Sequence, residues 1–368
     1  MPVSRRKAIA LIGGGVVLAA NASVATFWGT RTPHAALAPW DMAGGYDDPR
    51  LNAVSFGLLA PNPHNLQPWM IELVGDDGLL LHHDTSKRLP ETDPFDRQIM
   101  IGMGCVLEQT RIAASAMGYS VDMQPFPDGA NGPVATLTFA SEGNADPLVA
   151  GIMNRRSCKE PFEDKPVPES LAEKLATFAD IYTDPTVVET VRKLTFDAWQ
   201  VEYETPRTLQ ESIDLMRMGK SEINASPDGL DIGGGFLESA MALGMVSRED
   251  LATPGTYSFE EGVRMYKTML EATPAYAVLT SKTNTRADQL DAGARWLRLN
   301  LATTQAGLAL HPVSQCLQEY PEMHDHYAAA HEIFAGPGET VQMLGRLGYG
   351  PTIPRTPRWA LEHKLKHA

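Results

Sequence analysis

The sequence predicts an α+β protein made of two tandem, subunit-like halves, each an antiparallel-rich sheet flanked by helices. Two observations support this fold class. Stretches with the two-residue period of strands occur in both halves, separated by stretches with helical spacing. A helical stretch at residues 104–118 also resembles one at residues 293–307. The chain is long enough for such halves to share ample core.

The first half reads in order as a helix, a strand pair, a longer helix and a further strand. The helix ends before Pro61, which cannot continue it. The strand pair alternates apolar side chains and turns at Gly75, and the longer helix closes at Gly118. The expected ranges are 51–60, 68–74 with 78–82, 102–117 and 134–139, followed by a polar linker at 141–147.

The second half begins with a loop and a helix that starts at Pro168, a good first-turn residue. A strand, a long helix and a late strand follow. The expected ranges are 154–166 for the loop, 168–179 for the first helix, then 276–279, 289–306 and 341–347. Residues 187–271 are mostly helical with a Gly-rich break at 229–235, and they have no counterpart in the first half. We therefore expect halves at 50–145 and 150–365, the second carrying a lid-like insertion at about 187–271.

The helix-like stretches 104–118 and 293–307 carry the similarity between the halves. Both begin and end with glycine, and both have alanine at the tenth place, Ala113 and Ala302. An internal repeat explains this pattern, although core helices of unrelated origin also look alike.

Composition and charge exclude several classes of function. The net charge is −14, whereas a phosphate backbone requires a basic face, so we expect no nucleic-acid partner. The three cysteines are too few and scattered for a disulfide framework or a zinc site. His311, His324 and His326 have no neighbouring ligand set in the sequence, so no metal is expected.

The N-terminus has the pattern of an export signal. A basic run, SRRK at residues 4–7, precedes an uncharged apolar stretch at residues 8–30. This pattern favours a twin-arginine-type signal within residues 1–36, followed by a Pro/Gly-rich tether at 31–48. The expected location is then the periplasm or cell envelope, with transient contact with the export machinery. The alternative is a membrane anchor at residues 8–30.

Two polar segments are the candidates for chemistry. Residues 60–69 read APNPHNLQPW, a proline-stiffened loop whose amides and imidazole suit a heterocycle with alternating N and C=O groups. Residues 154–162 read NRRSCKEPF, where three cations and a hydroxyl suggest an anion site, because guanidinium groups bind phosphate bidentately. A hydrogen-bonded turn and a solvated charged loop are the alternatives.

Together these segments resemble the two FMN-binding signatures of the nitroreductase family. GYGP at residues 348–351, followed by Arg355 and Arg358, resembles the end of that family, and GLALHP at 307–312 resembles the segment leading to the flavin edge. SQCLQEYPEM at 314–323 and PDG at 227–229 are most similar to the Acg-like branch. The resemblance covers roughly residues 50–360 and implies a nitroreductase-like fold with FMN as cofactor.

The order of the signatures differs from the ordinary family pattern. The resemblance implies that Arg-Arg-Ser normally precedes Asn-x-Gln-Pro-Trp and that two subunits share each site. Here Asn65 comes before Arg155, which fits two subunit-like halves fused into one chain. No second complete pair of signatures is present, so we expect one flavin and a monomer that acts as an internal pseudo-dimer.

The resemblance also implies roles for individual residues. Arg155, Arg156 and either Arg355 or Arg358 would meet the phosphate, with Ser157 adding a hydroxyl. Lys159 would lie near the N1/C2 carbonyl of the ring, where a cation stabilises the anionic reduced flavin. Ser314 and Gln315 would lie near N5. The residues expected at the ribityl chain and the polar edge of the ring are Asn62, Pro63, His64, Asn65 and Gln67.

The implied function is that of an FMN-dependent oxidoreductase. Electrons would pass through flavin N5 from NAD(P)H or another donor to a small acceptor such as a quinone or a nitro compound. The alternative is a flavin-binding or sequestering protein in which the insertion covers the ring and turnover is small or absent. Stopped-flow mixing with NADH or NADPH separates the two, since only the enzyme would be bleached rapidly.

Overall fold

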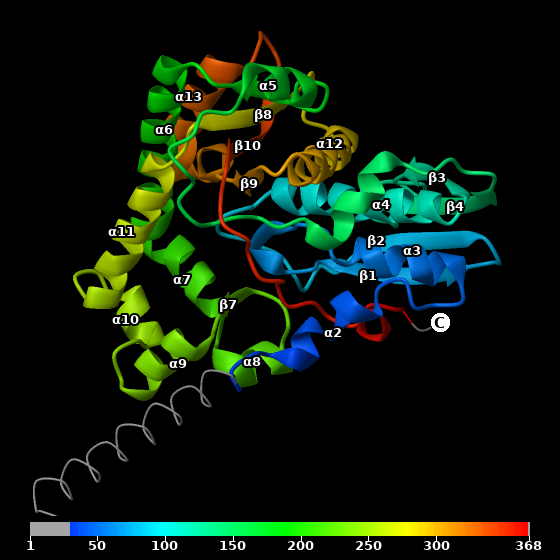
Figure 1. The fold of residues 1–368 in the computed structure, drawn as a ribbon, viewed down its shortest axis with the longest axis horizontal. Coiled ribbons are helices and arrows are strands. Elements are labelled where there is room, and N and C mark those ends of the chain that lie inside the picture. Colours follow the sequence, from blue (N-terminus) through cyan, green and yellow to red (C-terminus); the bar gives the residue numbers. More distant parts are fainter. Residues whose placement is uncertain (1–29, 367–368) are drawn as a thin grey trace, which may run out of the picture.

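The computed structural model describes residues 30–366 and shows an α+β fold, in which helices pack on two antiparallel sheets (Figure 1). Each sheet has four strands, in the orders β1-β2-β4-β3 and β5-β8-β10-β9. A short parallel pair, β6-β7, lies apart from both. None of the described helices is both long and apolar enough to span a membrane.

The first half forms the sheet and helices at the right of Figure 1. Trp69 and Ile71 on its first strand are buried, and Gly75, at a φ of 56°, makes the turn to the next strand. Its elements are α3 (Pro49–Gly57), β1 (Trp69–Val74), β2 (Gly78–His83), α4 (Arg97–Ala116), β3 (Tyr119–Pro125) and β4 (Ala135–Ser141). The expected strands and helices are therefore present, and β3 is added where the sequence showed none.

The second half repeats this topology. In each sheet an edge strand is followed by its neighbour, a twenty-residue helix, the opposite edge strand and finally the strand between. Its elements are α5 (Glu169–Leu175), β5 (Asp180–Tyr182), β8 (Ala275–Ser281), α12 (Arg286–Gln305), β9 (Ala309–Pro312), α13 (His324–Phe334) and β10 (Thr340–Gly348). The two halves thus have the same strand order as well as similar helices.

The helices α4 and α12 pack against each other through the glycines that begin the repeat. A Cβ added to Gly104 would lie 2.1 Å from the carbonyl oxygen of Leu290, and one added to Gly293 would lie 2.0 Å from that of Ile101. Leu290 stands three residues before Gly293 in α12, and Ile101 stands three residues before Gly104 in α4. The contact between the two helices is therefore reciprocal. The crossing therefore has approximate two-fold symmetry, and only glycine permits so close an approach.

The insertion forms an arm of helices that runs down the left of Figure 1. Trp199 lies in the core of this arm, stacked between Tyr203 at 4.6 Å and Tyr266 at 4.3 Å between ring centroids. Much of the insertion is therefore helical core. Its elements are α6 (Pro185–Glu204), α7 (Pro206–Asp214), β6 (Met216–Met218), α8 (Gly219–Ala225), β7 (Leu230–Ile232), α9 (Gly235–Ala242), α10 (Arg248–Ala252) and α11 (Tyr257–Glu271).

The two ends of the described chain meet beside the first half. After β10 the chain runs back to β1, where the backbone N–H of Ile71 donates to the carbonyl of Lys364 at 2.7 Å.

The prediction of a tether at residues 31–48 is wrong, because this stretch forms helix α2 (His34–Met42) and buries Trp40. The Trp40 indole donates to Thr356 O at 2.8 Å, and this tertiary contact overrides the helix-breaking composition. The predicted export signal within residues 1–36 falls mostly on residues 1–29, which lie outside the described residues.

Candidate functional site

The loop at residues 62–67 is strained. His64, Asn65 and Gln67 have φ values of 47°, 54° and 52°, in the left-handed region that side chains with a Cβ rarely adopt. Each such residue costs roughly 1–2 kcal/mol. The loop lies directly on α4, where a Cβ at Gly102 would come within 3.0 Å of Pro63. Strain of this kind persists only where surrounding contacts enforce it, and it concentrates at functional sites.

The contacts that enforce the loop come from the C-terminal segment and the insertion. Asn65 accepts from Arg358 Nη1 at 2.6 Å and donates to Pro357 O at 3.1 Å. Gln67 donates to Pro227 O at 2.7 Å and accepts from the Trp359 amide at 2.9 Å. The backbone N–H of Gln67 in turn donates to Asn62 Oδ1 at 2.8 Å.

These contacts correct the expected role of Gln67. Its side chain is 0% exposed and both of its polar ends have protein partners, so it positions the loop rather than facing a cofactor. Asn65 is half-buried, and its amide has one N–H not used by Pro357. Asn65 therefore remains available to a ligand, whereas Gln67 does not.

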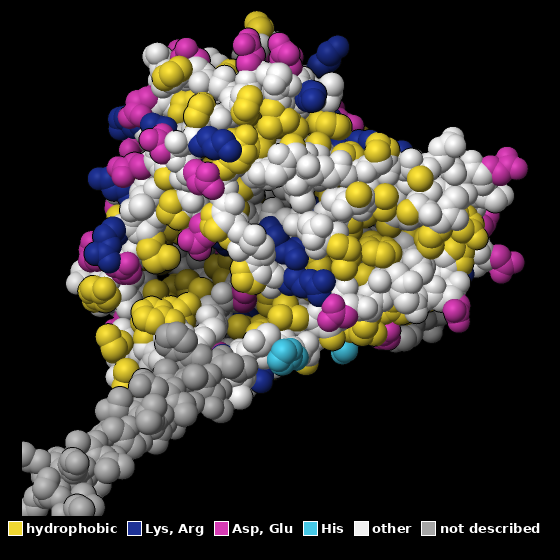
Figure 2. Space-filling view, in the orientation of Figure 1, with side chains coloured by type: hydrophobic (Ala, Val, Ile, Leu, Met, Phe, Trp, Pro, Cys, Tyr) yellow, Lys and Arg dark blue, Asp and Glu magenta, His cyan; other side chains and the backbone are white. Residues whose placement is uncertain are grey.

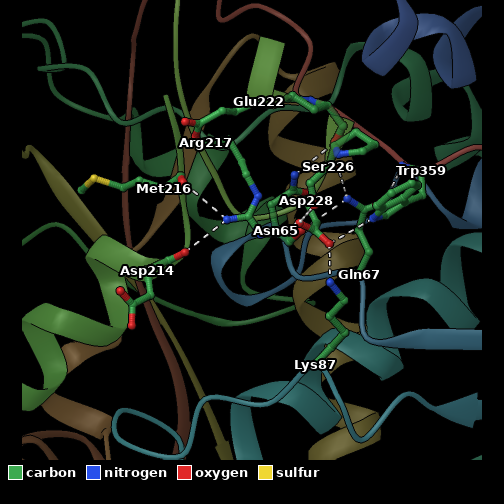
Figure 3. Close-up of polar contacts among 12 residues, drawn as sticks. Asn65, Gln67, Lys87, Asp214, Met216, Arg217, Glu222, Ser226, Asp228 and Trp359 are labelled. Atoms are coloured by element: carbon green, nitrogen blue, oxygen red, sulfur yellow. Dashed lines mark hydrogen bonds and ion pairs between the residues drawn. The ribbon is translucent and has the colours of Figure 1, made fainter. Parts of the chain in front are cut away.

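Asp228, from the insertion, is the centre of the polar network beneath this loop (Figure 3). Its carboxylate accepts from Lys87 Nζ at 2.6 Å, Arg217 Nη2 at 2.7 Å, Ser226 Oγ at 2.8 Å and Trp359 Nε1 at 3.0 Å. Burial opposes the charge, but these hydrogen bonds outweigh it and hold the pKa of Asp228 below its usual range. The network thereby joins the first half, the insertion and the C-terminal segment.

Four arginines from distant parts of the chain form a cation cluster next to the loop: Arg155, Arg156, Arg355 and Arg358. Arg155 Nη2 and Arg358 Nη2 both donate to the carbonyl of Leu59, at 2.8 and 3.1 Å. Trp40 packs among them, 4.4 Å from Arg156, 5.6 Å from Arg355 and 5.8 Å from Arg358 between guanidinium carbon and ring centroid. The segment with Arg155 and Arg156 and the C-terminal segment with Arg355 and Arg358 therefore lie together around Trp40.

The positive charge of this cluster is poorly compensated. Burial, and then the neighbouring arginines, lower the pKa of Arg358 to about 9. Burial followed by repulsion also lowers the pKa values of Arg155 and Arg156 to about 10. Arg355 pairs with Asp41 at 2.5 Å, but within the described residues neither Arg155, Arg156 nor Arg358 has a carboxylate ion-pair partner. The Nε atoms of Arg155 and Arg156 are buried without a hydrogen-bond partner, so the cluster is suited to an anion.

We infer a cavity beside the cation cluster from the surroundings of Lys159 and Asp231. Lys159 and Asp231 are exposed to solvent, yet burial lowers the pKa of Lys159 and raises that of Asp231. Solvent reaches both side chains, yet many protein atoms surround them. A side chain in such surroundings lines a recess rather than a convex surface. Figure 2 shows a hollow near the middle of this face with Lys and Arg side chains at its edge. Within the described part of the chain, the Lys159 ammonium has no hydrogen bond or ion pair.

His64 presents an unused ring nitrogen in this region. Its Nδ1 is buried without a hydrogen-bond partner. Burial, with a smaller contribution from the Lys159 charge, lowers the pKa of His64 to about 4, so the imidazole is neutral at pH 7. A neutral imidazole can donate or accept one hydrogen bond, which suits the polar edge of a bound heterocycle.

The two residues expected near N5 have different environments. Ser314 is buried and donates to Leu344 O on β10 at 3.2 Å, which ties its loop to the sheet; its position near N5 stays a prediction. Gln315 is half-buried and lies beside the carboxyl of Glu202, whose pKa it lowers. Ser157 is half-buried next to Arg156.

Sequence reasoning missed four residues of this site. Trp40, Glu202, Asp228 and Asp231 lie in the expected tether or in the insertion, where no pattern in the residues indicates which side chains turn toward the 62–67 loop. The Pro227–Gly229 match to the Acg-like branch was the one sequence feature pointing to Asp228. No group of three or more His, Cys, Asp or Glu side chains suited to a metal occurs among the described residues.

Similarity to known proteins agrees with a relationship to nitroreductases. The chain is 26% identical over 328 residues to a Mycobacterium tuberculosis protein named "Putative NAD(P)H nitroreductase acg", covering 83% of this chain and 92% of that protein. It is 24% identical over 337 residues to "Putative NAD(P)H nitroreductase Rv3131" of the same organism, covering 85% and 90%. No family model matches the chain.

Solved structures are similar only at a distance. An FMN-dependent nitroreductase, NfnB from Mycobacterium smegmatis in complex with NADPH, is 15% identical with a TM-score of 0.35, covering 60% of this chain and 96% of that one. A structure described as a "putative nitroreductase" from Anabaena variabilis is 13% identical with a TM-score of 0.41, covering 80% of this chain and 82% of that one.

Proposed function

We propose that this chain is an FMN-dependent oxidoreductase of the nitroreductase type, belonging to its Acg-like branch. The observation that carries the proposal is the cation cluster, in which two predicted phosphate residues of the second half, Arg155 and Arg358, converge on one carbonyl of the first half, Leu59 O. The sequence similarity to two proteins named as NAD(P)H nitroreductases supports it.

The residues present fit FMN in their chemistry. The phosphate would meet the cation cluster, whose unpartnered Nε atoms on Arg155 and Arg156 offer charge-assisted hydrogen bonds. Lys159 and His64 would face the ring from the cavity, with Asn65 and Gln315 at its polar edge. When bound, the flavin supplies the transfer of a hydride or of electrons. The protein would hold it, keep His64 neutral and place a cation at the ring.

One active site per chain follows from the asymmetry between the halves. In the first half Arg50 is already engaged by Asp48 at 2.7 Å and by the carbonyls of the turn after β1. It therefore offers no free cation for a second phosphate. We propose a monomer that acts as a pseudo-dimer, with one flavin and a small-molecule electron donor and acceptor. Location in the cell envelope remains part of this proposal, on the N-terminal pattern alone.

A lidded flavin store with little turnover is the second candidate. It is favoured by the insertion, whose residues 226–231 bind the 62–67 loop through Pro227 O and the Gly229 amide. The solvent access of Lys159 within its recess favours the enzyme, because a small substrate could reach it. Stopped-flow mixing of flavin-loaded protein with NADH and NADPH decides between them. Rapid bleaching supports turnover, whereas bleaching by dithionite alone supports storage or a different donor.

Binding of FMN is tested by comparing it with riboflavin, which lacks the phosphate. Flavin-free protein should bind FMN at least 100-fold more tightly than riboflavin, because only FMN pairs with the cation cluster. Fluorescence titration of both ligands measures the ratio, and raising the salt concentration should reduce it. Equal affinities would contradict the phosphate site.

A further inference from the structure

Glu202 is a buried carboxyl of the insertion, close enough to Lys159 to be affected by its charge. It lies in the last turn of α6 and accepts from Gln318 Nε2 at 2.7 Å. No cation forms an ion pair with it within the described residues. A buried carboxylate held only by neutral carboxamides is costly to ionise, so this group favours its protonated form.

The groups that face Glu202 come from every neighbouring element. Lys159 of the cavity and the carboxamides of Gln315 and Gln318 favour the charged form. Burial and the negative charge of Glu211 on α7 oppose it, and Tyr266 of α11 and Tyr320 lie close enough to be affected by its charge. The balance, dominated by burial, raises the pKa of Glu202 to about 7.

The carboxyl has a polar route toward the cavity. Gln318 is 4% exposed and its Oε1 has no hydrogen-bond partner, although its amide nitrogen binds Glu202. Gln315, next to Glu202, is half-buried and lies in the segment expected at the reactive edge of the flavin. An unused acceptor beside a carboxyl provides a position for a water molecule, which can donate to that acceptor and relay a proton from the carboxyl.

We propose that Glu202 is the proton donor for the second substrate, a quinone, whose reduction rests on the function proposed above. A quinone that receives a hydride from the reduced cofactor needs one proton on its oxygen to become a hydroquinone. The O–H bond of the Glu202 carboxyl breaks, a new O–H bond forms on the quinone oxygen, and a carboxylate remains. Gln318 and the positive charge of Lys159 stabilise that carboxylate until water returns a proton.

The first test concerns the proton itself and needs no cofactor. Infrared difference spectra of the flavin-free full chain between pH 5 and pH 9 should show a carboxylic C=O band that titrates near pH 7 and is lost in Glu202→Gln. The control, Glu204→Gln, changes an exposed carboxylate on the same helix and should keep the band. A wild type without this band, or a Glu202→Gln variant that retains it, would overturn the assignment.

The second test concerns proton delivery. Protein loaded with FMN and reduced by dithionite is mixed with a water-soluble benzoquinone, and reoxidation is followed by absorbance. Above pH 7 the wild-type rate should fall as the carboxyl ionises, whereas Glu202→Gln should be roughly 100-fold slower and independent of pH. A variant with the wild-type rate and pH profile would overturn the role of Glu202. Failure of both proteins to take up FMN would instead overturn the proposed function, while the infrared result stands.

Discussion

The Arg155→Ala protein is expected to purify with little or no flavin and to bind added FMN about 100-fold more weakly than the wild type. Arg155 is 3% exposed, and its guanidinium joins Leu59 O, at the start of the 62–67 loop, to Asn300 Oδ1. Removing it takes a positive charge from the phosphate site and also removes one of the two arginine hydrogen bonds to the Leu59 carbonyl. A 100-fold loss corresponds to about 2.7 kcal/mol, within the range for charge-assisted hydrogen bonds.

Two controls separate charge from packing at this position. Arg155→Lys keeps the charge but loses the planar fork, so its affinity should be intermediate. Arg264→Ala removes an arginine whose side chain is 67% exposed on α11, and it should bind FMN normally. An Arg155→Ala protein that carries full flavin, at wild-type affinity, would show that the phosphate lies elsewhere.

The Asp228→Ala protein is expected to lose about 3 kcal/mol of unfolding free energy together with most of its FMN affinity. The substitution leaves Lys87 and Arg217 beside an uncompensated, partly buried position, and breaking a buried ion pair costs about 3–5 kcal/mol. The estimate is at the low end because both cations are partly exposed. The Trp359 indole also loses its acceptor, so the contacts that hold His64, Asn65 and Gln67 in strained conformations weaken.

Urea denaturation of the wild type and the variant measures this loss. Asp197→Ala is the matched control, because Asp197 forms an ion pair with the exposed Lys193 on α6 and should contribute less than about 1 kcal/mol. A loss below 1 kcal/mol for Asp228→Ala, with unchanged flavin binding, would show that the loop keeps its conformation without Asp228.

The sequence predicted the local features of the fold well because those features follow from short-range patterns. Gly104 and Gly293, aligned as the start of a repeat, are the residues at which α4 and α12 pack closest. Gly118 and Gly307, predicted to close these two helices, follow the helix ends in the structure, and both have positive φ. The α+β architecture and its duplicated topology were therefore accessible from residue types and periods.

The sequence indicated the cationic residues of the candidate site but not its acidic residues. Arg155 and Arg358 stand in recognisable motifs, which predict that both meet one phosphate, and in the structure both donate to Leu59 O. Asp228 and Glu202 lie in an insertion without a counterpart in the first half, and their roles depend on contacts with Trp359 and Gln318 far along the chain. The Trp40 contact was hidden for the same reason, because a Pro/Gly-rich composition gave no sign that α2 would pack on the C-terminal segment.

The central claim is that one FMN binds per chain at the cation cluster. The most direct test is the visible absorption spectrum of the purified full chain after saturation with FMN and desalting, with flavin and protein quantified in the same sample. The account predicts oxidised-flavin bands and a ratio of FMN to protein near one. A spectrum without flavin bands, or a ratio near two, would contradict it.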